Sequence, residues 1–397
     1  MRSAKEFRYS LIAREVYIAR SVSRMGLSHR LGWKLPTVTR LTTELRDRGI
    51  LTELRASTEG KPGHPSTDLS ITPGYCLTLG LEFGPDQLRW AVTDAAGGII
   101  ASQEVAAPDF EPGQGTVDLV VKVIHASLEA AGIDYAQFAS IGIGLHAYVN
   151  AKGDWLPQGP LGSTDIFSTV EHFTKAFGRP VIVEDIARMF ALAEHRLGSG
   201  ADAADALYLL VGPSGFGAGI VSNNALLAPS LGFGGEVGHV TATIGNAPKC
   251  SCGNYGCLRT LASGFAIAER AAALSGLPDL RDRDAYAKYP LPDLCRAAAN
   301  SDPFAQKVLM QGVEFIAFAL ANTINVTGTP HVVIGGDFIN AGEDVLRQLE
   351  AQLKARTIPA LAPHISVQYS SLPTAPGPVG AALRALDAYW AAPSINL

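Results

Sequence analysis

Along the first fifty residues, apolar side chains recur with the period of an amphipathic α-helix. Residues 5–22 show this spacing most clearly, at Phe7, Leu11, Ile12, Val16, Ile18, Ala19 and Val22. Ser23 is a suitable N-cap for a short second helix over residues 24–30, and residues 31–33 are expected to turn. A third helix is predicted over residues 35–48, with Pro36 in its first turn and Gly49 at its end.

The third helix separates its apolar and polar positions onto two faces. Val38, Leu41 and Leu45 form an apolar stripe, and the outward positions are Lys34, Thr37, Thr39, Arg40 and Thr43. Residues 50–54 are predicted to form a strand, and residues 59–71 a turn with a return strand. Three helices followed by a hairpin are typical of a winged helix-turn-helix. The alternative is a small helical cap domain whose outward polar residues are only solvated.

From Tyr75 onward the pattern changes to that of an α/β protein. Strands are predicted at residues 75–83, 88–97, 98–106, 139–149 and 180–186, with helices at 117–131, 171–177 and 187–197. A second cycle begins with a strand at 206–212 and a glycine-rich segment at 213–221. It continues with helices at 261–275 and 303–327, a strand at 331–336, and helices at 342–356 and 379–392. Two similar lobes indicate a duplicated fold with a cleft between them.

Composition divides the chain in the same way. The 397 residues are 47% apolar and 17% charged, which is enough material for two or three packed units and excludes a disordered chain. The formal charge is −5, yet residues 1–70 hold 13 Lys and Arg against 7 Asp and Glu. A basic head on an acidic body indicates that only the head binds a polyanion. No apolar run approaches a membrane span and the first twenty residues carry charges throughout, so a cytoplasmic protein is expected.

Three of the five cysteines lie within eight residues of one another. His239, Cys250, Cys252 and Cys257 supply one imidazole and three thiolates, which is the donor set of a closed tetrahedral zinc site. Gly253 and Gly256 suit a loop that must turn tightly around a metal. A redox cluster and a cluster without metal are the alternatives. With four protein ligands the zinc has no open position, so it is expected to be structural, one per chain.

These residues resemble the ROK family (repressors, open reading frames, kinases) over nearly the whole chain. The segment LGFGGEVGHV followed by CSCGNYGCL is similar to the family signature. The segment VSRMGLSHRLGWKLPTVTRLTTELRDRGIL resembles the winged helix of its repressor branch, and GKPGHP stands in the place of the wing. The resemblance implies an actin-like, hexokinase-like body of two ribonuclease H-like lobes, preceded by a winged helix-turn-helix domain. The expected domains are residues 1–72, residues 73–190 with the returning helix 376–397, and residues 191–375.

The resemblance also implies which residues bind a sugar. Glu236 corresponds to the acid that binds sugar hydroxyls in the family, and His239 to a histidine that binds zinc beside the sugar. The kinases carry their catalytic base in an Asn-Asp-x-Asn segment, which here reads Glu184-Asp185-Ile186-Ala187. Asp185 is therefore a vestigial base and a candidate sugar ligand, and Glu184 is a second candidate. His146, in GLHAYVN, is expected either to border the cleft or to be structural.

Both phosphate-binding turns differ from those of ATP-using relatives. The first reads Glu82-Phe83-Gly84-Pro85-Asp86, where Pro85 lacks an N–H donor and Asp86 adds a negative charge beside a polyphosphate. In the second turn, GPSGFGAG, Ser214 could replace the family's threonine, but Pro213 intrudes. We therefore expect no catalytic residue and no kinase activity.

The expected function is that of a sugar-responsive DNA-binding regulator, a repressor of carbohydrate uptake or catabolism genes. Its partners would be an inverted-repeat operator in double-stranded DNA, a sugar effector, and a second or further copies of the chain in a homodimer or homotetramer, with no membrane. The DNA contacts would come from Lys34, Thr37, Thr39, Arg40, Thr43, Arg48, Lys61 and His64. Lys34 stands where repressor relatives usually carry a Ser or Thr N-cap. Two alternatives remain: a sugar kinase with a regulatory head, and a regulator controlled by a protein partner.

Overall fold

A computed structural model describes residues 4–55, 67–84, 87–106, 114–154, 170–372 and 375–392. The chain forms two compact units. One comprises Met1–Gly144, Thr164–Val183 and Ala381–Leu397, and the other comprises Leu145–Ser163 and Glu184–Gly380. The strand predicted over residues 180–186 therefore includes the point, between Val183 and Glu184, where the chain passes from one unit to the other.

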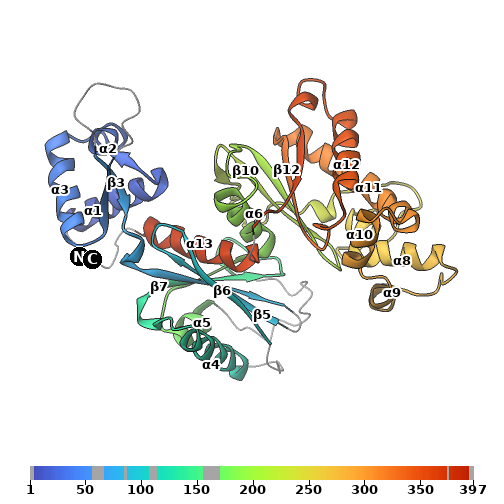
Figure 1. The fold of residues 1–397 in the computed structure, drawn as a ribbon, viewed down its shortest axis with the longest axis horizontal. Helices are drawn as coiled ribbons and strands as arrows, with labels where there is room; N and C mark the ends of the chain where they lie inside the picture. The colour runs from blue at the N-terminus through green and yellow to red at the C-terminus, as the bar shows by residue number, and fades with distance from the viewer. Residues whose placement is uncertain are drawn as a thin grey trace. The chain divides into compact units, whose positions relative to one another are not determined.

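The head has the predicted order of helices and strands. It contains α1 (Ala4–Ala19), β1 (Val22–Ser23), α2 (Arg24–Leu31), α3 (Leu35–Asp47), β2 (Leu51–Arg55) and β3 (Thr67–Ile71), and the sheet order is β1-β3-β2 (Figure 1). Ser23 caps α2 as predicted, because its Oγ accepts a 3.0 Å hydrogen bond from the Gly26 N–H. Lys34 precedes α3 without a side-chain cap.

The prediction that the first helix continues to Val22 is wrong. The helix ends at Ala19 because Arg20 takes a left-handed conformation, with φ of 60°. Val22 then pairs with Leu69 in an antiparallel bridge. An apolar residue at helical spacing is also an apolar residue suited to a strand, so the pattern alone did not distinguish the two.

The first five-stranded sheet lies in the same unit as the head. Its strands are β4 (Leu77–Phe83), β5 (Gln87–Asp94), β6 (Ile99–Ala106), β7 (Phe138–Leu145) and β8 (Val181–Asp185), in the order β6-β5-β4-β7-β8. Helices α4 (Gln114–Ala130) and α5 (Val170–Phe177) cover one face, and α13 (Pro376–Ala391) covers the other (Figure 1). Gly142 permits this packing, since a Cβ there would lie 1.9 Å from the Ala381 carbonyl oxygen.

The second unit repeats the same sheet. It contains β9 (Ala206–Val211), β10 (Phe216–Ser222), β11 (Ala225–Leu226), β12 (His331–Gly336) and β13 (Ser366–Tyr369), in the order β11-β10-β9-β12-β13. Numbered within each unit, both sheets run 3-2-1-4-5. The predicted duplication of an actin-like lobe is therefore confirmed.

The helices of the second unit are α6 (Ile186–Leu197), α7 (Arg259–Ala262), α8 (Gly264–Leu274), α9 (Asp282–Lys288), α10 (Leu291–Ala299), α11 (Pro303–Thr327) and α12 (Glu343–Arg356). The predicted helix over 261–275 is broken, because Ser263 ends α7 and caps α8 through its Oγ. Within the described residues, α11 is the one helix long and apolar enough to span a membrane. It packs in the core of this unit through Val308, Val313, Ile316 and Leu320.

The core of the head includes residues from the other end of the chain. Tyr9, Ile12, Leu41 and Leu45 pack in one hydrophobic cluster with Leu386 and Trp390 of α13. The Trp390 indole N–H donates a 3.1 Å hydrogen bond to the Ala95 carbonyl. The head is therefore not joined to the body by a linker alone. It packs against the first sheet and α13, and burial of large aromatic side chains stabilises this contact.

Candidate metal centre and ligand-binding site

His239 ends a short 3-10 turn, Val237–His239, that follows Glu236. Gly235 allows the chain to reach this turn, because its φ is 86° and a Cβ would lie 1.7 Å from the Ala218 carbonyl oxygen. The Gly235 carbonyl in turn accepts the Ala218 N–H of β10 at 3.0 Å. A glycine is thus required here by both conformation and space, and it sets the position of Glu236 and His239 against the sheet.

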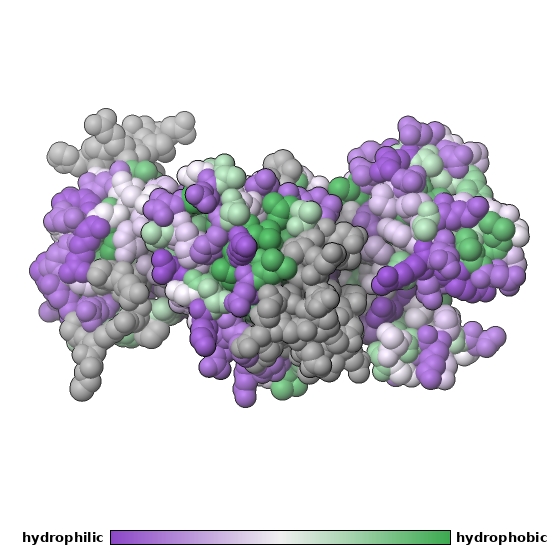
Figure 2. Space-filling model, turned by 90° about the horizontal axis from the view of Figure 1, so that it is seen from below, coloured by the Kyte–Doolittle hydropathy of each residue, from purple (hydrophilic) through white to green (hydrophobic). Residues whose placement is uncertain are grey.

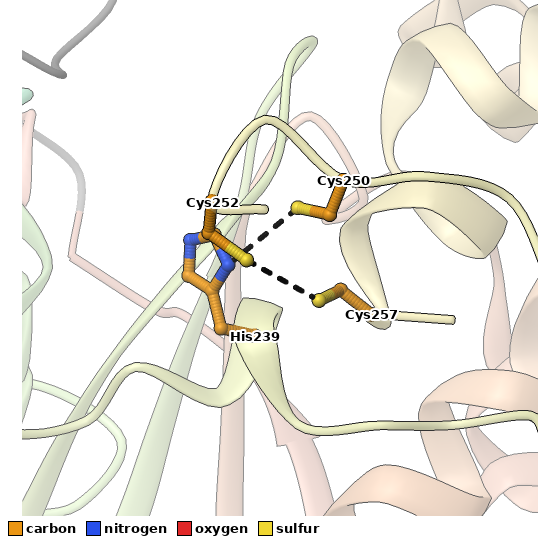
Figure 3. A group of neighbouring side chains, drawn as sticks. All are labelled: His239, Cys250, Cys252 and Cys257. Carbon is orange, nitrogen blue, oxygen red and sulfur yellow. Dashed lines mark hydrogen bonds between the residues drawn. The ribbon is translucent and has the colours of Figure 1, made fainter. Parts of the chain in front are cut away.

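Four predicted metal ligands converge. His239, Cys250, Cys252 and Cys257 each offer one ligand atom, and these atoms all lie within 4.8 Å of one another (Figure 3). Cys250 and Cys257 are buried, and Cys252 is exposed. The Cys250 Sγ lies 3.7 Å from the His239 Nδ1, and the Cys252 Sγ lies 3.7 Å from the Cys257 Sγ.

These distances fit a tetrahedral zinc site. Zn–S distances are about 2.3 Å and Zn–N distances about 2.0 Å. A tetrahedral zinc ion therefore places two sulfur ligands roughly 3.8 Å apart, and a sulfur and a nitrogen ligand roughly 3.6 Å apart. A disulfide would instead need about 2.05 Å between sulfurs. The donor set therefore fits zinc, held by the three thiolates and the imidazole Nδ1.

The loop that carries the cysteines is closed by backbone hydrogen bonds. The Cys250 N–H donates to Asn254 at 2.7 Å, and the Gly253 N–H donates to Cys250 at 3.0 Å. Gly253 and Gly256 have φ of 96° and 72°, as expected for a tightly turning loop. A Cβ on Gly256 would lie 2.1 Å from the Thr243 carbonyl oxygen, so the loop could not close around a larger residue.

On its other side, the His239 ring meets a residue that the sequence pattern did not single out. The Tyr148 hydroxyl lies 2.5 Å from the His239 Nε2. Burial raises the pKa of Tyr148 to about 12, and Glu236 raises it further. Burial lowers the pKa of His239, so its imidazole is held in the neutral form that binds metals.

Asp185 and Glu236 form a pair of interacting carboxyl groups. Asp185 is the N-cap of α6, and its Oδ1 accepts the Ala187 and Arg188 N–H groups at 2.9 and 3.2 Å. Burial nevertheless raises the pKa of Asp185 to about 6, and the charge of His146 opposes this rise. Burial, together with Asp185, raises the pKa of Glu236 to about 7. Near neutral pH, the two carboxyl groups can therefore accept hydrogen bonds from a polar ligand and, when protonated, donate hydrogen bonds to it.

Glu184 faces a buried arginine. The Glu184 Oε1 lies 3.0 Å from the Nε of Arg188, whose Nη1 donates to the Leu227 carbonyl at 2.6 Å. Arg188 is only 5% exposed and lowers the pKa of Glu236 by its charge. Of the two candidate ligands at this strand end, Asp185 thus neighbours Glu236, whereas Glu184 compensates the charge of Arg188.

The second glycine-rich turn is engaged by the protein itself. Arg259 donates through Nε and Nη2 to the Ser214 carbonyl at 3.2 and 2.8 Å. The first N–H groups of α8, from Gly264 and Phe265, donate to the carbonyls of Gly212 and Pro213 at 3.2 and 2.7 Å. The helix end that could have bound phosphate therefore faces carbonyl oxygens. Pro85 and Asp86, of the first turn, lie outside the described residues.

The predicted DNA-binding residues are spread over α3 and its ends. Lys34, Thr39, Arg40 and Arg48 are exposed, whereas Thr37 and Thr43 are half-buried. The described residues of the head are mostly hydrophilic on the face drawn in Figure 2. Arg40 is held by Glu44, with 2.9 Å between Nη1 and Oε1. Lys61 and His64 lie outside the described residues.

Tyr148, Arg188 and Arg259 were missed by the sequence analysis. Arg188 had a usable signal, since a single arginine in the apolar run of α6, four positions after Glu184, needs a partner. Tyr148 had none, because it is 91 positions from His239.

The chain is similar to known proteins over most of its length. The model of the ROK family matches residues 78–388. A xylose repressor from Caldicellulosiruptor bescii is 24% identical over 93% of this chain and 92% of its own length. A glucokinase from Halalkalibacterium halodurans is 26% identical over 76% of this chain and 92% of its own. The solved structure of a ROK family transcriptional regulator, a homologue of the Escherichia coli MLC protein, superposes with a TM-score of 0.78. It is 25% identical and covers 97% of this chain and 98% of its own.

Proposed function

The chain belongs to the ROK family, and on that premise we propose that it is a sugar-responsive transcriptional regulator. It represses genes of carbohydrate uptake or catabolism and has no kinase activity. The observation that carries the proposal is the helical head with its small antiparallel sheet, joined to a ROK body in one chain. The xylose repressor matches 93% of the chain, a share that is reached only if most of the head is included.

In this proposal residues 1–72 bind DNA. Residues 73–190 with 376–397 form the first lobe, and residues 191–375 form the second. Helix α3 enters the major groove with Thr37, Thr39 and Arg40 at the base edges. Lys34, Thr43 and Arg48 contact phosphates, and Lys61 and His64 belong to the wing. A dimer or tetramer binds an inverted repeat, because one head offers few contacts.

The proposed effector is a sugar held by the second unit. Asp185 and Glu236 accept hydrogen bonds from its hydroxyls, and His239 lies beside them with one structural zinc on its Nδ1. The zinc supplies rigidity, because four protein ligands leave it no open position. Glu184 shapes this site through Arg188. A reduced, cytoplasmic setting suits three zinc thiolates.

Absence of kinase activity is supported by the second turn. A phosphate there would have to displace the Arg259 side chain from Ser214, or the first N–H groups of α8 from their carbonyls. Pro213 itself has no N–H to offer. The Gly212 N–H is also engaged, since it donates to the Gly215 carbonyl at 2.9 Å. These contacts leave fewer backbone donors for a phosphate than an open glycine-rich turn would offer.

A sugar kinase with a regulatory head is the second candidate. It is favoured by the retained carboxyl group of Asp185, whose pKa of about 6 suits a general base, and by the match to a glucokinase. A coupled assay with ATP, magnesium and a panel of hexoses decides between the candidates. Sugar-dependent release of ADP would establish the kinase and contradict our proposal.

DNA binding tests the leading proposal. Fluorescence anisotropy with fragments from upstream of the gene should give specific binding that weakens steeply with salt. Arg40→Ala should weaken specific binding by about 1–3 kcal/mol, roughly 5- to 150-fold. Arg347→Ala, a paired surface arginine of the second unit, is the matched control. Titration with sugars should then release the DNA. A protein that binds no fragment specifically, or whose binding is unchanged by Arg40→Ala, would refute the assignment of the head.

A further inference from the structure

Tyr148 lies against the candidate metal centre of the second unit. Its hydroxyl is 2.5 Å from the Nε2 of His239, and its ring centre lies 6.0 Å from that of the imidazole. His239 ends the short turn that Glu236 begins, three positions earlier in the chain. Tyr148 thus contacts the metal-ligand candidate on the same turn that carries Glu236.

The direction of the hydrogen bond follows from the metal. The His239 Nδ1 faces Cys250, so a zinc ion in this cluster takes the Nδ1 lone pair. A neutral imidazole bound through Nδ1 keeps its proton on Nε2. Nε2 must then donate, and the Tyr148 oxygen must accept. The hydroxyl proton of Tyr148 is therefore free to be donated elsewhere.

Tyr148 keeps that proton at neutral pH, because a tyrosine phenol ordinarily ionises only at about pH 10. Glu236 and a hydroxyl or ring oxygen of a bound ligand are acceptors suited to it. The zinc-bound form thus presents one O–H donor beside the metal-bound imidazole.

We propose that Tyr148 is a positioning and specificity residue: it orients the metal-bound imidazole of His239 and donates its own proton to an oxygen of the ligand at Glu236. The part that concerns the ligand rests on the proposed function, and the part that concerns the metal does not. The ligand class that fits is a neutral polyol with an acceptor oxygen at this point. An ammonium group of a ligand at this point has only N–H donors and no acceptor, so the Tyr148 O–H could not donate to it.

Metal binding tests the first part of this proposal. Tyr148→Phe removes only the hydroxyl, and loss of such an outer-shell partner weakens metal binding by about tenfold to a hundredfold. Competition with a chromophoric zinc chelator should show this loss, and the visible absorption bands of the cobalt-substituted protein should shift. Tyr255→Phe is the matched control, because Tyr255 lies on the cysteine loop but is 59% exposed. Circular dichroism and thermal unfolding of the zinc-loaded wild type and both variants should show that all three proteins are folded.

Ligand binding tests the second part. Calorimetry of the zinc-loaded protein with pentoses, hexoses and their 2-amino derivatives should find a neutral sugar whose affinity falls at least tenfold in Tyr148→Phe but not in Tyr255→Phe. Equal zinc affinity and equal cobalt spectra in both variants would overturn the positioning role. Equal sugar affinity in both would overturn the specificity role. If no sugar binds the wild-type protein, the proposed function and the specificity role fail, while the zinc comparison still decides the positioning role.

Discussion

The hydroxyl of Tyr17, in the first helix of the head, donates a 2.7 Å hydrogen bond to Oδ1 of Asp387 in the last helix. The Trp390 ring lies 6.1 Å from that of Tyr17 and 6.0 Å from that of Tyr75. Helix α13 carries both Asp387 and Trp390, and its residues up to Gly380 belong to the second unit. The last helix of the chain therefore completes the core of the head.

The Tyr17–Asp387 hydrogen bond should stabilise the attachment of the head. We expect Tyr17→Phe to lower the free energy of unfolding by about 1.5 kcal/mol, a typical value for a hydrogen bond to a charged group. The effect should be non-additive with Asp387→Asn in a double-mutant cycle measured by urea unfolding. Tyr255→Phe is the exposed control. Fully additive effects would show that the hydrogen bond contributes nothing in solution.

Gly380 should be intolerant of any side chain. A Cβ at this position of α13 would lie 1.8 Å from the Met189 carbonyl oxygen of α6, the helix that Asp185 caps. Gly380→Ala should therefore lower the free energy of unfolding by about 1–3 kcal/mol through overpacking. Gly74→Ala, which meets no atom within 4 Å, is the control for the change of residue type. Unchanged thermal unfolding of Gly380→Ala would mean that α6 and α13 separate easily.

Substitution of a cysteine inside the cluster should remove the zinc, whereas substitution of a cysteine outside it should not. Elemental analysis of the purified protein should give about one zinc per chain, and Cys257→Ser should lose it together with thermal stability. Cys295→Ser is the matched control, since Cys295 is equally buried but lies outside the cluster. Equal zinc content in the two variants would rule out the proposed ligand set.

Glu236 should make stability depend on pH in a defined direction. Burial, with Asp185, raises its pKa to about 7 from an ordinary value of 4.5, against the charge of Arg188. Between these values the folded state binds a proton that the unfolded state has lost, so this contribution to stability falls as pH rises. Glu236→Gln should thus gain stability relative to wild type at pH 8, and the gain should vanish near pH 4.5.

The matched measurement is urea unfolding of both zinc-loaded proteins across this range. Titration of the cysteines and of His239 affects wild type and variant alike, and it cancels in the difference between them. A difference that does not vary with pH would show that Glu236 is ionised throughout in the folded protein.

Sequence patterns predicted those features that depend on residues close together in the chain. The helix and strand order of the head, the repeat of strands and helices in the body and the four residues of the His-Cys cluster follow from local spacing, whereas the actin-like form of the lobes was implied by the family resemblance. The ligands span only residues 239–257, and the turns between them are marked by glycines with positive φ. Ser23 could likewise be identified as a cap because its partner, Gly26, is three positions away.

What remained hidden depends on side chains that meet from distant parts of the chain. Tyr148 and His239 are 91 positions apart, and Tyr17 and Asp387 are 370 positions apart. No periodicity relates such residues. Val22 illustrates a different reason for a wrong prediction. Its apolar side chain fits the helical spacing, but its backbone pairs with Leu69 in the sheet of the head.

The packing of Trp390 against the head has a consequence for the order in which the protein is made. A ribosome finishes the head first, but the 370 positions from Tyr17 to Asp387 separate it from the helix that completes its core. At about 5–20 residues per second, this delay is roughly 20–75 s. During that time α3 rests on an unfinished hydrophobic surface. If the head binds DNA as we propose, chains that are still being translated, or that end early, should therefore compete poorly for DNA with the finished protein.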